Sequence, residues 1–200
     1  KALSIKPNYA DAYNNMGIIL QKQGKLEDAI VAYTKAISIK PDFTEAHFNM
    51  GIVLKNQGKP EEAIEAYTKA ISIKPDFADA YNNMGNALKD QGKLDEAIEA
   101  FEKTISLKPD YAEVYNNMGN ALKDQGKLAE AIEVFEKSTD QLSIAKALEC
   151  TYFLGNYDDF NLRLHSIAKR DPTNIRVAAM STFAANQRQV EDAYPFCPNP

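Results

Sequence analysis

The stretch YNNMGNALKDQGKL stands at residues 81–94 and again, letter for letter, at 115–128. The two copies are 34 residues apart, and one proline and two glycines recur at the same spacing through the first part of the chain. A period of this length predicts a repeat protein in which each unit is one supersecondary element. The recurring prolines are Pro7, Pro41, Pro75 and Pro109, and the two glycine sets are Gly17, Gly51, Gly85, Gly119 and Gly24, Gly58, Gly92, Gly126.

Within one period, residues 78–111, the apolar side chains form two helical stripes on either side of Gly92. Gly92 suits the left-handed residue that ends a helix, Pro109 stops the second helix, and Asp76 is predicted to cap the first. Gly85 is expected to let the partner helix approach closely, because glycine inside a helix is about 1 kcal/mol less favourable than alanine. The stripes follow helical spacing and comprise Tyr81, Met84, Gly85, Leu88 and then Leu94, Ala97, Ile98, Phe101, Thr104, Ile105.

A single helix pair cannot bury both of its stripes, whereas stacked pairs can, as in a solenoid. The chain resembles the tetratricopeptide repeat, a 34-residue helix–turn–helix unit, and the residues that carry the resemblance are Tyr81, Met84, Gly85, Leu88, Gly92, Ala97, Phe101 and Pro109. The resemblance implies an all-α fold, a right-handed superhelical solenoid of antiparallel helix pairs. Two departures from the family pattern are mild: His47 stands where other units have tyrosine, and Pro60 stands where they have leucine, at a helix start that tolerates proline.

The period divides the chain into four full units followed by less regular segments. After about residue 138 the register breaks, yet Gly155 and Pro172 keep the separation of Gly92 and Pro109. We therefore expect a degenerate fifth hairpin and a capping helix before an extended tail or linker. The predicted segments are 1–9, the end of a truncated preceding repeat; 10–43, 44–77, 78–111 and 112–140, the four repeats; 141–172, the fifth hairpin; 173–187, the capping helix; and 188–200, the tail.

Composition and charge argue against several classes of protein. A net charge of −5 and a pI of about 5.2 argue against a nucleic-acid binder that neutralises phosphates. No apolar run approaches the roughly 20 residues that span a bilayer, so we expect no membrane partner. Cys150 and Cys197 lie far apart without metal-ligand spacing, and neither a metal nor another cofactor is expected. The chain begins at Lys1 inside a repeat and is interpreted as a fragment, with a cytoplasmic location expected.

No residue pattern indicates catalysis. His47 occupies a core-stripe position and is interpreted as a packed histidine, and His165 has no neighbouring carboxylate or cysteine pattern. The sequence contains no metalloprotease, nucleophile-elbow, phosphate-loop or dinucleotide-binding motif. Acidic pairs recur at helix starts, where complementing the helix dipole explains them better than acid–base chemistry does. We therefore expect no catalytic residues and interpret this chain as a non-enzyme.

Asparagine recurs on the first helix of each unit, beside the apolar stripe. Inside a helix it is less favourable than alanine by up to about 0.7 kcal/mol, so its repetition needs a reason. In a stacked array these side chains would line up as a ladder, and a primary amide can pair with a peptide group of any sequence. One series is Asn15, Asn49, Asn83 and Asn117; its neighbours are Asn14, Asn82 and Asn116, with Phe48 in the second unit; and Asn86 and Asn120 lie one turn later.

The family resemblance implies that the first helices line a concave surface that binds peptides or protein segments. The Asn15 series resembles the asparagine ladder of the O-linked N-acetylglucosamine transferase superhelix, where such side chains hold the backbone of a target. A second reading stays open, in which these asparagines bond within the solenoid. A carboxylate clamp is rejected, because Asp11 and Glu45 occupy positions where it needs cations.

The sequence thus predicts a non-catalytic interaction module that binds an extended peptide. One alternative is a substrate-recruiting domain of a larger enzyme, a glycosyltransferase or a 2-oxoglutarate and iron oxygenase; the tail YPFCPNP at 194–200 is similar to linkers before such oxygenase domains. Another is self-association through the open end, where Ala2, Leu3 and Ile5 would lack a partner helix. The predicted peptide-binding residues are Asn15, Asn49, Asn83, Asn117, Asn82, Asn86, Asn116 and Asn120.

Overall fold

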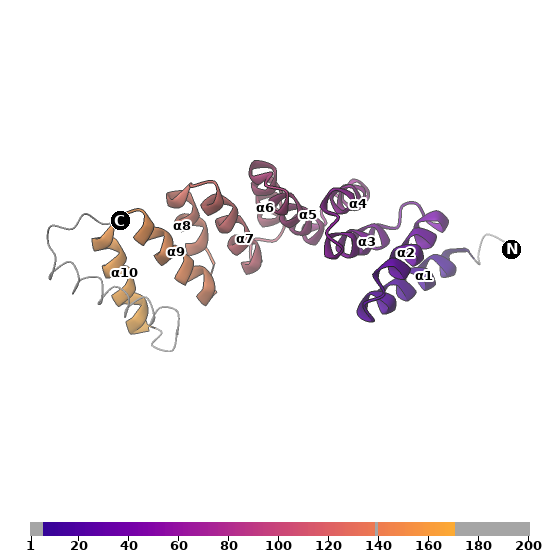
Figure 1. Cartoon of the computed structure of the whole chain (residues 1–200), viewed down its shortest axis with the longest axis horizontal. Coiled ribbons are helices and arrows are strands. Elements are labelled where there is room, and N and C mark those ends of the chain that lie inside the picture. The colour runs from indigo at the N-terminus through magenta and orange to yellow at the C-terminus, as the bar shows by residue number, and fades with distance from the viewer. Residues whose placement is uncertain (1–5, 139, 171–200) are drawn as a thin grey trace. The chain divides into compact units, whose positions relative to one another are not determined.

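A computed structural model describes residues 6–138 and 140–170, with side chains for 9–138, 140–167 and 169 (Figure 1). Every regular element in this part of the chain is a helix, which confirms the predicted all-α fold. The predicted capping helix, the tail and the residues Ala2, Leu3 and Ile5 lie outside the described residues. The helices are α1 (Lys6–Lys22), α2 (Leu26–Ile39), α3 (Thr44–Asn56), α4 (Pro60–Ile73), α5 (Ala78–Asp90), α6 (Leu94–Leu107), α7 (Ala112–Asp124), α8 (Leu128–Glu136), α9 (Gln141–Phe153) and α10 (Tyr157–Arg170).

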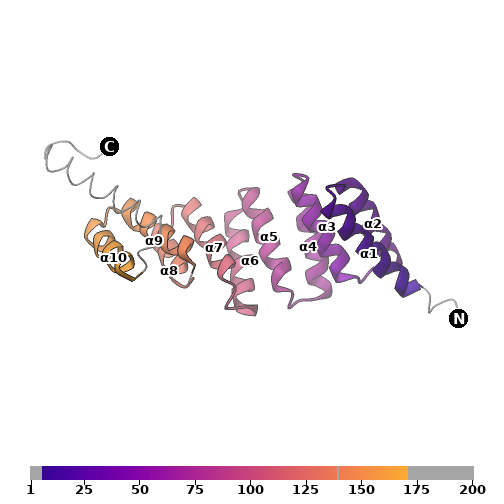
Figure 2. The ribbon, with the colours of Figure 1, turned by 90° about the horizontal axis from the view of Figure 1, so that it is seen from below.

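The chain divides into two compact units, residues 1–121 and 122–200, which we describe separately. In the first unit α1 pairs with α2, α3 with α4 and α5 with α6, each through a short turn (Figure 2). Successive pairs also touch, because α2 packs against α3 and α4 packs against α5. The first helices of the pairs meet as well, α1 with α3 and α3 with α5. This unit is therefore a stack of helix pairs with one continuous row of first helices.

Both expectations for the recurring glycines are confirmed. Gly92 lies in the turn between α5 and α6 with φ at +75°, a conformation that side chains with a Cβ rarely adopt. Gly85 lies where α5 meets α6, and a Cβ built on it would be 2.6 Å from Cε1 of Phe101. Because the Phe101 ring is completely buried, it has little room to move away. Gly85 thus lets the Phe101 ring of the partner helix pack directly against the backbone of α5.

One aromatic side chain lies at the centre of each helix pair of the first unit. These residues are buried completely, and in the second pair Tyr67 packs in a cluster with Ala63, Ala66, Leu54 and Ala87. The small side chains let the helices close around the ring, and burial of one such ring contributes about 1.5–3 kcal/mol. The central residues are Tyr33, Tyr67 and Phe101, and Phe135 of α8, which holds the same position in the period, is also buried completely.

One helix start differs from the sequence expectation. Asp76 does not cap α5, because the residue before the helix is Phe77 and no side-chain hydrogen bond caps it. Phe77 instead anchors the turn by packing: its ring centroid is 4.7 Å from that of Phe48 and 5.2 Å from the Lys74 ammonium. Helix α1 begins at Lys6, and the assignment of residues 1–9 to the end of a preceding repeat stays a prediction.

In the second unit α8 packs against α9, and α9 packs against α10. Asp140 caps α9 by accepting a hydrogen bond from the Ser143 N–H at 3.3 Å. Leu148 of α9 packs with Phe160 and Leu164 of α10. Residues 141–170 thus form a helix pair, and the assignment of 141–172 as a degenerate fifth repeat stays a prediction.

Candidate functional site

The asparagines of the Asn15 series lie on the first helices α1, α3, α5 and α7. Because α1 contacts α3 and α3 contacts α5, the first three positions follow one another along a continuous row of helices. Asn15 is exposed, so its amide is free to meet a ligand from solvent. The half-buried members of the candidate site, which keep part of their surface accessible, are Asn49, Asn83, Asn117, Asn86 and Asn120.

The neighbouring series is buried, and only 2% of Asn82 is exposed; the other members are Asn14 and Asn116. Asn49 Nδ2 donates a hydrogen bond to Asn14 Oδ1 at 3.1 Å. Asn117 Nδ2 donates to Asn82 Oδ1, also at 3.1 Å. Each bond joins successive repeats and contributes a net stabilisation of about 0.5–1.5 kcal/mol. The reading in which asparagines bond within the solenoid is therefore correct for these two pairs.

The second repeat interrupts this pattern, and the interruption has a visible consequence. Phe48 occupies the position that Asn14 and Asn82 hold in their repeats. Its ring packs against Phe77, and it offers no acceptor to the next repeat. Asn83 accordingly donates from Nδ2 to the backbone carbonyl of Asp79, one turn earlier in its own helix, at 2.8 Å. The bond that each surface asparagine makes thus depends on the residue one repeat before it.

Tyr111 extends the bond between Asn117 and Asn82. The side chains of both Asp79 and Asn82 act on its hydroxyl. Burial raises the pKa of Tyr111, and the carboxylates of Glu113 and Asp79 raise it further, so the hydroxyl stays protonated and can donate to Asp79. The hydroxyl oxygen is then left to accept from the Asn82 amino group. Sequence reasoning missed this tyrosine, although the two preceding repeats have phenylalanine at its position, Phe43 and Phe77.

Comparison with known protein families gives the origin of this arrangement. Models of the tetratricopeptide repeat match residues 10–43, 32–65 and 112–141, and a model described as TPR repeat matches 53–92 and 85–126. Together these matches run without a gap from residue 10 to residue 141, which is more than half of the chain. The chain belongs to the tetratricopeptide-repeat family. No curated protein sequence matches it significantly.

Solved structures share the tetratricopeptide fold. The crystal structure of MamA has a TM-score of 0.75 at 21% identity and covers 96% of this chain and 98% of its own. YrrB, described as a TPR protein with an unusual peptide-binding site, has a TM-score of 0.71 at 20% identity, with 90% and 97% covered. The first TPR of Spaghetti (RPAP3), bound to the HSP90 peptide SRMEEVD, has a TM-score of 0.59 at 24% identity, with 60% and 94% covered. At these identities the likeness establishes the fold alone.

The two histidines His47 and His165 differ in their burial. His47 is buried, and its Nε2 lies 3.0 Å from the carbonyl oxygen of Pro41, to which it donates. Tyr115 makes the equivalent bond from its hydroxyl to Pro109 at 2.9 Å, which explains how histidine replaces tyrosine here. The interpretation of His47 as a packed residue is confirmed. His165 is exposed.

Among the residues that the structure describes, no helix is long and apolar enough to cross a membrane. In the same part of the chain, no group of three or more histidine, cysteine, aspartate or glutamate side chains is placed to hold a metal ion.

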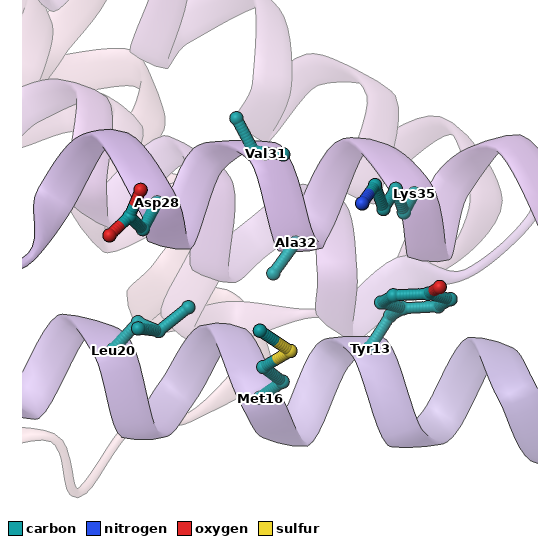
Figure 3. Close-up of a pocket in the computed structure, with 7 residues that line it drawn as sticks. All are labelled: Tyr13, Met16, Leu20, Asp28, Val31, Ala32 and Lys35. Atoms are coloured by element: carbon teal, nitrogen blue, oxygen red, sulfur yellow. The ribbon is translucent and has the colours of Figure 1, made fainter.

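A pocket that the sequence did not predict lies between α1 and α2 (Figure 3). Its volume is about 290 Å³, and α1 and α2 line its two sides. In the second repeat Leu54 and Ala66 hold the positions of Leu20 and Ala32, and Ile30 from α2 packs against their cluster. The pocket therefore corresponds to the site where, in the second repeat, the second helix of the preceding repeat packs. Its lining residues are Tyr13, Met16, Leu20, Asp28, Val31, Ala32 and Lys35.

Proposed function

We propose that this tetratricopeptide chain is a protein-interaction module that binds an extended peptide or protein segment along its first helices. The observation that carries the proposal is the row of amides on consecutive first helices, of which α1, α3 and α5 contact in turn. An amide has a donor and an acceptor and can pair with any peptide group, and evenly repeated amides suit an extended chain. The residues proposed to touch the ligand are Asn15, Asn49, Asn83 and Asn117, with Asn86 and Asn120 beside them.

Asn82 and Asn116 are proposed to belong to the site by a different role. Both are buried, so they position neighbouring surface residues and expose little area of their own to a ligand. Two proteins with a similar fold support a peptide as the ligand: YrrB is described with a peptide-binding site, and the Spaghetti domain is bound to an HSP90 peptide. The finer likeness to the transferase ladder stays a prediction, as does the cytoplasmic location.

A peptide array compared between matched variants tests this function. Changing Asn15, Asn49, Asn83 and Asn117 together to alanine should lower the affinity for the captured peptides more than about tenfold. Each lost hydrogen bond costs about 0.5–1.5 kcal/mol. The matched control changes exposed glutamates of the second helices α4 and α6 to alanine and should bind as the parent does: Glu61, Glu65, Glu99 and Glu102.

Folding is checked by circular dichroism, because Asn49→Ala and Asn117→Ala also break bonds between repeats. A double variant, Asn15→Ala with Asn83→Ala, leaves those bonds intact and should still bind more weakly than the glutamate control. Unchanged capture by both folded asparagine variants would contradict the proposal. The comparisons lend no support to the alternative of an enzyme-recruiting domain.

A second candidate function is end-to-end association with a second copy of the chain. Ile19 of α1 is 57% exposed, whereas Val53 at the same register of α3 is buried completely against α2. Large exposed apolar side chains in the described part of the chain gather in the first helix pair and the last, where Leu162 of α10 is 72% exposed. Two separate apolar surfaces on one chain, on the first helix pair and on α10, suit a head-to-tail contact between copies.

Light scattering at increasing protein concentration tests this contact. Ile19→Glu or Leu162→Glu alone should lower the average mass, because either change removes one side of the contact. The matched control is Ile73→Glu, at an apolar residue that is 37% exposed within the array. A monomer at every concentration, or an equal effect of the control, would exclude end-to-end association.

A further inference from the structure

The half-buried asparagines of the Asn15 series each use a side-chain N–H inside the protein. Asn49 and Asn117 donate to a buried asparagine of the preceding repeat at 3.1 Å. Asn83 donates to the carbonyl oxygen of Asp79 at 2.8 Å. A primary amide has two N–H donors and a carbonyl oxygen with two lone pairs. After these bonds, each of the three retains its whole acceptor capacity and half of its donor capacity.

At Asn83 and Asn117 the chemistry of the partners fixes which end of the amide turns inward. A backbone carbonyl can only accept, so Asn83 must offer its amino group to Asp79. At the other pair, Asn82 Oδ1 accepts from Asn117 Nδ2, and the Asn82 side chain lowers the pKa of the Tyr111 hydroxyl, as donation from the Asn82 amino group would. With its amino group engaged there, Asn82 meets Asn117 through Oδ1. Asn117 consequently points its own amino group inward and leaves Oδ1 for a ligand.

From this arrangement we infer that the asparagine row is a row of acceptors that recognises a bound chain by its backbone N–H groups. Asn14 and Asn82 are positioning residues, which orient Asn49 and Asn117 from within the array. The inference rests on the proposed peptide-binding function and adds the polarity of recognition. It implies selection against proline wherever the ligand meets the row, because proline has no backbone N–H.

The positioning role can be measured without any ligand. In nitrogen-15 NMR spectra, the side-chain amide protons of Asn49 and Asn117 should exchange with water several-fold more slowly than those of exposed Asn15. Asn82→Leu should bring Asn117 to the rate of Asn15 and leave Asn49 unchanged, and Asn14→Leu should do the reverse. Each variant thus serves as the control for the other. Equal exchange at all three asparagines in the parent protein would overturn the positioning role.

The polarity is tested with a peptide selected on the parent protein from a random library. Each backbone N–H is replaced in turn by an ester oxygen, and each residue in turn by proline. Ester replacement at positions that meet the row should weaken binding about 3- to 10-fold, the effect of losing one hydrogen bond. Asn82→Leu should abolish the sensitivity of one such position. In the N83A variant, which keeps both asparagine pairs, only the position that meets residue 83 should lose its sensitivity.

The outcomes separate this inference from the function on which it rests. One outcome is that the asparagine-to-alanine variants of the row abolish binding while no ester replacement weakens binding by more than about 2-fold. In that case the proposed function stands and the acceptor row is wrong. If the selected peptides bind the row variants as well as the parent, the proposed function fails, and the acceptor row fails with it.

Discussion

Replacing Tyr67 by phenylalanine should stabilise the protein, whereas the same replacement at Tyr33 should destabilise it. Both rings are buried completely at the centre of their helix pairs. The Tyr33 hydroxyl donates to Gln21 Oε1 at 3.0 Å. The Tyr67 hydroxyl is buried and has no hydrogen-bond partner among the described residues. One substitution therefore removes a hydrogen bond in the first repeat and an unsatisfied polar group in the second.

The neighbouring sequence explains why the two tyrosines differ. Lys55 occupies in the second repeat the position that Gln21 has in the first. Its ammonium can only donate and therefore offers the Tyr67 hydroxyl no acceptor, and it pairs with Asp90, at 3.4 Å from Oδ2. The third and fourth repeats carry phenylalanine at the tyrosine position together with lysine at the Gln21 position.

The magnitudes follow from the hydrogen bonds. An unsatisfied buried hydroxyl costs about 1–3 kcal/mol, so we expect Tyr67→Phe to raise the free energy of unfolding by about 1 kcal/mol. Tyr33→Phe should lower it by about 1 kcal/mol, the usual net value of one hydrogen bond. In a chain of this size 1 kcal/mol corresponds to about 2–4 °C in Tm, so the two variants should differ by about 4–8 °C.

Urea and thermal unfolding, followed by circular dichroism, measure both variants against the parent. The sharper test adds Lys55→Gln, which places an acceptor beside Tyr67 as Gln21 stands beside Tyr33. In that background Tyr67→Phe should destabilise by about 1 kcal/mol, as Tyr33→Phe does, so the double-mutant cycle should give a coupling of about 2 kcal/mol. If Tyr67→Phe alone destabilises as much as Tyr33→Phe, or the coupling is zero, the reasoning is wrong.

Three more perturbations test other parts of the structure. Gly85→Ala should lower stability by about 1–3 kcal/mol despite the better helix propensity of alanine, because its Cβ would overlap the Phe101 ring; Gly85→Ala with Phe101→Leu should recover part of the loss in urea unfolding. Burial raises the pKa of Tyr33 from 10.0 to about 12, so its contribution to stability is complete below pH 10 and is lost as the pH rises towards 12; Tyr33→Phe should flatten this part of the stability profile. Asn82→Ala should cost about 1–3 kcal/mol more than Asn83→Ala, because Asn82 is buried and its loss leaves the Asn117 N–H without an acceptor; equal losses in thermal unfolding would contradict this account.

The helix pairs were predicted well from the sequence because the residues that end each helix act within one turn of the chain. A glycine such as Gly92 requires a backbone conformation within one turn, and the same letters recur in every repeat. The start of α5 was predicted wrongly for the opposite reason. Capping rules favour Asp76, but Phe77 holds the turn through its contact with Phe48, a residue from the preceding repeat. A rule that considers only neighbours in sequence has no means of weighing that contact.

The asparagines show the same limit at the candidate site. Asn82 and Asn83 are adjacent in sequence, but successive side chains on a helix point about 100° apart, so that one can be buried while the other reaches the surface. Which of them faces inward depends on the repeats on either side. Phe48 makes this dependence visible: its effect falls on Asn83 in the following repeat, which then bonds within its own helix. A substitution in one repeat therefore changes the surface of the next, and the ligand-facing chemistry of each repeat has to be worked out together with the buried position of the repeat before it.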